Sequence, residues 1–184
     1  MSIPWTRRRF LQATFGSLAA LWITGSLPRT LWAGPLPEGR LSLYHLHTEE
    51  RLSVTYRSAS GDYDRQALQD LNYFFRCHDT NRATTMDLRV LEYLGAVDRQ
   101  LGGDHELHII SGYRSPEYNE RLIQAGRGVA KHSYHLQGQA VDFHIPGIDL
   151  TQVRIAALNL QLGGVGYYPE SDFLHIDSGP PRWW

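Results

Sequence analysis

Large apolar or aromatic residues alternate with polar ones in two early segments of the chain, residues 41–45 and residues 52–56. A short polar stretch, Thr48-Glu49-Glu50, separates the two segments. A period of two places alternate side chains on one face of a strand, and a short polar connection is typical of antiparallel neighbours. The pattern therefore predicts a β-hairpin at the start of the folded region.

Helical periodicity follows in three longer segments, residues 63–76, 87–101 and 150–161, where apolar residues recur at intervals of three and four. Gly102-Gly103 follows the second segment and Gly163-Gly164 the third, and we expect these glycines to end the helices. The second segment has a predicted buried stripe that consists of Leu88, Val90, Leu91, Leu94 and Val97.

Further strands are expected at residues 106–111 and 139–145, and two short strands complete the chain after residue 164. Ser115-Pro116-Glu117 predicts the start of another helix, because proline is favoured in a first turn. The pattern as a whole predicts an α+β fold, a single compact domain with a mostly antiparallel sheet flanked by helices.

Composition and charge exclude several classes of protein. The 184 residues include 42% hydrophobic and 20% charged residues, which suits an ordinary packed core. The net charge is −1, but residues 1–33 contain four arginines and no acidic residue, so the remaining domain has a charge of −5. Lys131 is the only lysine, and for so acidic a domain we expect no nucleic-acid partner. Cys77 is the only cysteine, which excludes an internal disulfide and a cysteine-based zinc site.

Residues 1–33 have the character of a targeting segment. Arg7-Arg8-Arg9 precedes an apolar stretch, and residues 6–12 resemble the twin-arginine export signal of bacteria. Leu31 would stand at the −3 position of a cleavage site after Ala33, where small residues are preferred, so an uncleaved membrane anchor stays open. We expect export to the periplasm through the twin-arginine translocase, with residues 34–184 as the functional domain.

Two of the expected strands each carry a His/Asp pair among apolar residues. Asp142 and His144 belong to the strand at 139–145, and His175 and Asp177 lie near the C-terminus. Alternate side chains point to opposite faces, so each pair lies on one face of its strand. If the two strands are adjacent, the buried charge would need a partner, and we expect a metal or a bound substrate there.

A longer motif precedes and includes the first pair. The pattern S-x-H-x-x-G-x-A-x-D at residues 133–142, followed by the distant His175, resembles the zinc-site pattern of the D-Ala-D-Ala metallopeptidases, in the wider set of lysostaphin-type endopeptidases and the hedgehog fold. Ser-Gly-Tyr-Arg-Ser at residues 111–115 is similar to a second motif of that family. With the export signal and the run at residues 164–168, residues 40–184 most resemble the YcbK-like murein endopeptidases.

The resemblance implies that His135, Asp142 and His175 are zinc ligands. Two histidines and one carboxylate leave a fourth position for water, which is the arrangement of a catalytic zinc site. Zinc lowers the pKa of such a water to about 7 and polarises the scissile carbonyl. The resemblance also implies that Arg114 stabilises the charge that develops on the attacked peptide, a contribution typically worth about 100- to 1,000-fold in rate.

The general base is predicted to be Asp172. Asp172-x-x-His175 resembles the arrangement in phage endolysins of the same set, where an aspartate is the base. Phe173 stands where other relatives have a histidine base, so that variant is excluded. Asp177 can instead orient a metal-bound histidine through its free ring nitrogen.

Several other residues have two interpretations. His132 forms an H-x-x-H pair with His135, but only His135 has the family's seven-residue spacing to Asp142, so His132 is predicted at the surface or in the substrate groove. His144 can line the cleft or hold a hydrogen bond beside it. The remaining histidines are predicted to be structural or solvated: His45, His47, His78, His105 and His108. Four aromatic residues are either carbohydrate-facing or part of the core: Tyr167, Tyr168, Trp183 and Trp184.

These features predict an exported, zinc-dependent peptidoglycan hydrolase that cuts peptide crosslinks in the stems of the bacterial cell wall. The sequence leaves the bond open, L,D or D,D. A D-alanyl carboxypeptidase and a metal-dependent amidase or esterase with another exported substrate remain as alternatives. From a different class, a non-catalytic peptidoglycan-binding or scaffold protein could retain the same zinc site.

Overall fold

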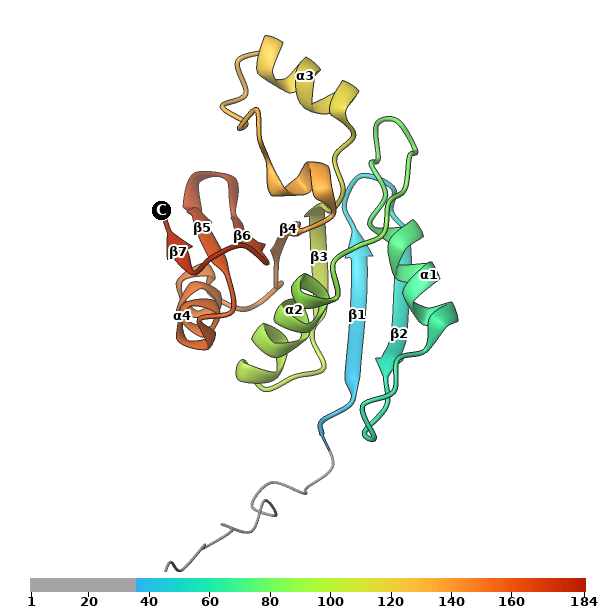
Figure 1. Cartoon of the computed structure of the whole chain (residues 1–184). Helices are drawn as coiled ribbons and strands as arrows, with labels where there is room; N and C mark the ends of the chain where they lie inside the picture. Colours follow the sequence, from blue (N-terminus) through green and yellow to red (C-terminus); the bar gives the residue numbers. More distant parts are fainter. Residues whose placement is uncertain (1–35) are drawn as a thin grey trace, which may run out of the picture. The chain divides into compact units, whose positions relative to one another are not determined.

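The computed structural model describes residues 36–184, so the expected export segment lies outside the described residues. A seven-stranded mixed sheet organises this part of the chain, with the order β2-β1-β3-β4-β6-β5-β7 (Figure 1). The strands are β1 (Gly39–His45), β2 (Arg51–Arg57), β3 (Glu106–Ser111), β4 (Ala140–His144), β5 (Gly164–Tyr168), β6 (Phe173–Asp177) and β7 (Arg182–Trp183). The helices are α1 (Arg65–Phe74), α2 (Leu88–Gln100), α3 (Pro116–Gln124) and α4 (Leu150–Leu160), with short 3₁₀ turns η1 (Tyr134–Gln137) and η2 (Pro169–Ser171).

Strand pairing confirms the predicted hairpin and most of the predicted sheet. Strands β1 and β2 are antiparallel, with Leu43 opposite Leu52. The pairs β3–β4, β4–β6 and β5–β6 are also antiparallel, whereas β1–β3 and β5–β7 are parallel. The expectation of a mostly antiparallel sheet is confirmed, with a third C-terminal strand, β7, that the sequence pattern did not indicate.

The apolar core lies between the sheet and helices α1, α2 and α4. Apolar residues of β4 and β6, such as Phe143 and Ile176, are fully buried on this side. Four of the five stripe residues predicted for α2 are also fully buried, but Leu88 is exposed because it is the first residue of the helix. Tyr93 is fully buried instead, and its hydroxyl donates a hydrogen bond to the carbonyl of Ala157 (2.9 Å).

Side-chain caps explain where the helices begin. Asp64, Asp87, Ser115 and Asp149 each accept a hydrogen bond from a first-turn amide of the helix that follows. The predicted end of α4 is correct to within one residue, but Gln161 rather than the following glycines takes the left-handed cap position (φ 52°), and Gly164 already begins β5. Among residues 36–184, no helix is both long and apolar enough to cross a membrane.

Candidate metal centre

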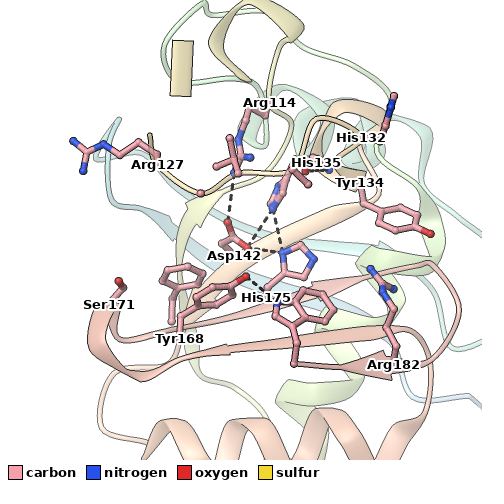
Figure 2. A pocket seen from close by; sticks show the side chains of 16 residues that line it. Arg114, Arg127, His132, Tyr134, His135, Asp142, Tyr168, Ser171, His175 and Arg182 are labelled. Atoms are coloured by element: carbon pink, nitrogen blue, oxygen red, sulfur yellow. Dashed lines mark hydrogen bonds and ion pairs between the residues drawn. The ribbon is translucent and has the colours of Figure 1, made fainter. Parts of the chain in front are cut away.

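Three sequence-distant side chains meet on the polar face of the sheet. Asp142 on β4 lies directly opposite His175 on β6 in the antiparallel register. His135 comes from η1, immediately before β4, and its ring turns toward the other two (Figure 2). The two strands that carry the His/Asp pairs, β4 and β6, are therefore neighbours in the sheet. Their pairing brings the three predicted zinc ligands together.

The three side chains are buried and nearly in contact. Nδ1 of His175 is 2.8 Å from Oδ1 of Asp142, and Nε2 of His135 is 3.2 Å from each of these two atoms. Within residues 36–184 this is the one group of three or more His, Cys, Asp or Glu residues whose ligand atoms lie within 4.8 Å of one another. Two imidazole nitrogens and a carboxylate oxygen form a donor set typical of catalytic zinc.

In His135 and His175, the ring nitrogen that points away from the cluster makes a hydrogen bond of its own, and this bond determines which nitrogen faces Asp142. Nδ1 of His135 is 2.7 Å from the carbonyl oxygen of Gly112, which only accepts, so this nitrogen carries the proton. Nε2 of His175 is 3.1 Å from Oδ2 of Asp177 and donates to that carboxylate. In their neutral forms both rings therefore turn a lone pair toward Asp142. Three lone-pair atoms facing one another in a buried space need a cation, and the donor set fits a metal.

The pKa values of the cluster show the same demand for positive charge. Burial disfavours the charged form of His175, but its hydrogen bonds with Asp142 and Asp177 raise its pKa to about 9. Burial would raise the pKa of Asp142, yet the two adjoining imidazoles hold it below its ordinary value. Burial lowers the pKa of His135. Either a proton on His175 or a metal cation can therefore supply the positive charge beside Asp142, so protonation of His175 competes with metal binding.

Asp177 is fully buried and holds His175 in place. Besides His175, it accepts two hydrogen bonds from the guanidinium of Arg182, at 2.7 and 2.9 Å, and one from the backbone amide of Gly179 at 2.9 Å. This arrangement suits the orienting role that the sequence allowed for Asp177. Arg182 was not identified from the sequence, because its approach to Asp177 depends on the unexpected strand β7.

Arg114 lies beside the cluster, as the motif implied. Its side chain is buried, with Nη2 at 3.8 Å from Oδ2 of Asp142 and Nη1 donating to Oδ1 of Asn119 at 3.3 Å. Nε of Arg114 is also buried and has no hydrogen-bond partner within the described residues. The guanidinium therefore retains donor capacity next to the three converging atoms.

Asp172, the predicted base, is not brought into the cluster. Its side chain is 74% exposed, and Oδ2 lies 3.2 Å from Nδ1 of His144. The residue adopts a left-handed backbone conformation (φ 51°) between Ser171 and Phe173, both of which line the pocket. Its role as base stays a prediction. His144 takes the hydrogen-bonding position foreseen for it rather than lining the pocket.

The cluster forms part of the wall of an open pocket of about 410 Å³ (Figure 2). His132 lines the same pocket without joining the three converging atoms. Aromatic side chains form part of the wall: Tyr134, Tyr168, Phe173 and Trp184. The ring of Tyr168 stacks on Phe173, and its hydroxyl accepts a hydrogen bond from Nε1 of Trp184 (2.8 Å). Of the four aromatics with two interpretations, Tyr168 and Trp184 thus face the pocket.

Comparisons with known proteins show which family the chain resembles. Residues 37–184 match a family profile described as peptidoglycan L,D-endopeptidase MepK. The chain is 45% identical over 144 residues to the peptidoglycan L,D-endopeptidase MepK of Escherichia coli K12, covering 78% of this chain and 79% of that protein. It is 40% identical over 145 residues to a probable peptidoglycan L,D-endopeptidase MepK of Haemophilus influenzae, covering 78% and 77%. No solved structure gives a significant match.

Proposed function

Because the chain belongs to the peptidoglycan L,D-endopeptidase MepK family, a family of metallopeptidases, we propose that it is a zinc-dependent endopeptidase that hydrolyses L,D-crosslinks of peptidoglycan. The observation that carries the proposal is the convergence of His135, Asp142 and His175 in the wall of an open pocket. The family supports the L,D bond, which the sequence pattern alone left open against D,D.

A zinc ion held by the three side chains would polarise the scissile carbonyl and lower the pKa of a water molecule. The chain's own groups prepare the site for this chemistry. The carbonyl of Gly112 and the carboxylate of Asp177 each hold one ring proton, so that the opposite nitrogens of His135 and His175 stay free to bind metal. Arg114 donates hydrogen bonds to the carbonyl oxygen as it gains negative charge.

Asp172 fits the role of general base better than Asp177, the other aspartate near the last metal ligand. Asp177 is fully buried and both of its oxygens already accept hydrogen bonds. Asp172 is open to solvent, and its neighbours in sequence line the pocket. In this proposal Asp172 takes a proton from water and delivers it to the leaving amine, while His144 orients its carboxylate.

The proposal is tested with defined crosslinked dimers. Purified wild-type protein and His175→Ala are incubated with zinc and either an L,D- or a D,D-crosslinked muropeptide dimer. We expect about one zinc per wild-type chain, monomers released from the L,D dimer, and less than 1% of that rate for His175→Ala. Zinc binding without cleavage would instead indicate a binding protein, and release of terminal D-alanine alone a carboxypeptidase. Cleavage confined to the D,D dimer would contradict the proposed bond.

We also propose that the chain is exported to the periplasm by the twin-arginine translocase, on the strength of Arg7-Arg8-Arg9 and the apolar segment after them. This route carries folded proteins, so the domain could acquire its metal in the cytoplasm. Changing all three arginines to lysine should trap the protein inside the cell. Normal periplasmic levels of that variant, or of wild type in a strain without the translocase, would contradict the proposal.

A further inference from the structure

The charges around the pocket are strongly one-sided. Three arginines line it, Arg114, Arg127 and Arg182, and the only acidic side chain among the lining residues is that of Asp142. The whole chain has 19 acidic residues against 18 lysines and arginines, so this imbalance is local to the pocket. The carboxylate of Asp142 already contacts the imidazoles of His135 and His175. The pocket therefore favours a substrate with negative charge.

Two of the three arginines already have protein partners. Arg182 forms a two-pronged contact with Asp177, and Arg114 contacts Asp142 and Asn119. The side chain of Arg127 has no hydrogen bond or ion pair within residues 36–184, and it is exposed. Figure 2 shows Arg127 on the side of the pocket opposite Arg182, with its guanidinium directed away from the three converging ligands. Arg127 is therefore available to a substrate group at a distance from the reacting carbonyl.

The loop that carries Arg127 is attached to the catalytic region. Gly126 (φ 67°) and Gly128 (φ 68°) take left-handed conformations on either side of Arg127, which form the bend that presents it. Asn119 donates to the carbonyl of Ala130 at 3.3 Å and accepts from Arg114, so one amide side chain joins the loop to the site. Through Asn119, the loop that carries Arg127 is held at a defined place beside Arg114.

We propose that Arg127 determines specificity for L,D-crosslinks by binding the distal carboxylate of the residue that supplies the scissile carbonyl. The inference rests on the proposed function. In an L,D-crosslink that residue is a diamino diacid, whose side chain ends in a carbon that bears a free carboxylate and an amino group, several bonds from the carbonyl. In a D,D-crosslink the same position holds D-alanine, which offers only a methyl group. A guanidinium directed away from the cluster suits the first substrate and gains nothing from the second.

The test compares two L,D-crosslinked dimers, one with this distal carboxylate free and one with it converted to a carboxamide. Wild type, Arg127→Gln and Arg127→Lys are assayed on both for kcat and KM, with Arg65→Gln as control. Arg65 is an exposed arginine on α1, outside the pocket lining. Zinc content and melting temperature are measured for every variant.

We expect wild type to prefer the free carboxylate by about tenfold in kcat/KM, the range of one hydrogen bond to a charged group. Arg127→Gln should lose that preference by slowing on the free-carboxylate dimer alone, Arg127→Lys should regain part of it, and Arg65→Gln should behave as wild type. Equal wild-type rates on both dimers, or an equal loss on both in Arg127→Gln, would overturn the inference while leaving the endopeptidase intact. If wild type cuts neither dimer, the proposed function fails and the inference fails with it.

Discussion

The direction of a single ring nitrogen decides whether the cluster can bind metal. His175 offers Nδ1 to the cluster only while Nε2 donates to Asp177. We predict that Asp177→Asn weakens zinc binding by about 10- to 100-fold, because an amide is a poorer acceptor and the paired Arg182 loses its carboxylate. Competition with a chromophoric chelator measures the change. Asp149→Asn, a cap substitution of equal size on α4, should leave zinc affinity unchanged; a wild-type affinity in Asp177→Asn would contradict the orienting role.

Asp172 provides a second prediction at this scale, one that separates chemistry from metal binding. Asp172→Asn should retain zinc and lower kcat by about 10²- to 10⁴-fold, since an amide cannot take the proton from water. The neighbouring exposed Glu170 offers a matched control in Glu170→Gln, which should keep full activity. Steady-state kinetics on the L,D dimer measure both variants. Full activity in a zinc-loaded Asp172→Asn protein would assign the base to another group.

The limits of sequence reasoning at the residue scale follow from these positions. Alternation placed Asp142 and His175 each on the polar face of its own strand, and the family motif added His135, but only the pairing of β4 with β6 showed that the three meet. Alternation does not apply at Asp172, where a left-handed turn precedes β6 and directs the side chain to His144. Arg182 reaches Asp177 through tertiary pairing of a two-residue strand, for which the sequence contains no local signal.

At the scale of elements, Gly138 controls the connection between η1 and β4 that delivers His135 and Asp142. It combines a left-handed conformation (φ 65°) with a crowded site, since a Cβ there would lie 2.7 Å from the carbonyl oxygen of Thr85. We predict that Gly138→Ala lowers the free energy of unfolding by about 2–4 kcal/mol, from backbone strain and the clash together. Urea denaturation monitored by fluorescence measures the loss.

Gly147 is the matched control for this prediction. It has a similar left-handed conformation (φ 82°), but no atom lies within 4 Å of its would-be Cβ. Gly147→Ala should therefore cost only about 1 kcal/mol, the strain alone. Equal losses in the two variants would show that packing against Thr85 is not what requires glycine at position 138.

Elements were easier to predict than their ends. The predicted starts at residue 87 and at Ser115-Pro116-Glu117 agree with those of α2 and α3, where Asp87 and Ser115 cap the first turn. The end of α4 was placed within one residue, but the residue that ends it is Gln161 in the left-handed cap rather than a glycine. The end of a helix depends on the backbone conformation of a single residue, and the type of that residue favours one conformation without determining it.

At the scale of the whole molecule, long-range pairing was the part that the sequence could not supply. The parallel contact between β1 and β3 joins strands that are separated by both α1 and α2. The same folding brings together the rings of His45 at the end of β1, His47 in the following turn and His78 after α1, although no sequence pattern linked these residues. His78 also contacts Tyr118 of α3 through Nε2 at 3.2 Å. This histidine cluster therefore joins three separate parts of the fold.

The histidine cluster makes global stability sensitive to acid. Burial, with His78 and His47 nearby, lowers the pKa of His45 to about 4 from an ordinary value of 6.5, and Glu50 only partly opposes this shift. The unfolded chain therefore binds the proton more readily than the native protein between these values. Stability due to His45 is complete above pH 6.5 and is lost as the pH falls toward 4.

We predict that this one group removes about 2 kcal/mol of stability between pH 7 and pH 4.5, and that His45→Asn largely abolishes its share. Asparagine does not titrate there, and its side-chain oxygen can still accept the amide of His47, as Nδ1 of His45 does at 3.2 Å. Urea unfolding of wild type and variant at both pH values gives the loss of unfolding free energy on acidification for each protein. Subtracting one loss from the other removes the contribution of the titrating groups that the two proteins share. The exposed His132→Asn should show the wild-type dependence. If His45→Asn loses as much stability as wild type on acidification, the acid sensitivity arises from other groups, and the titration of His45 does not control it.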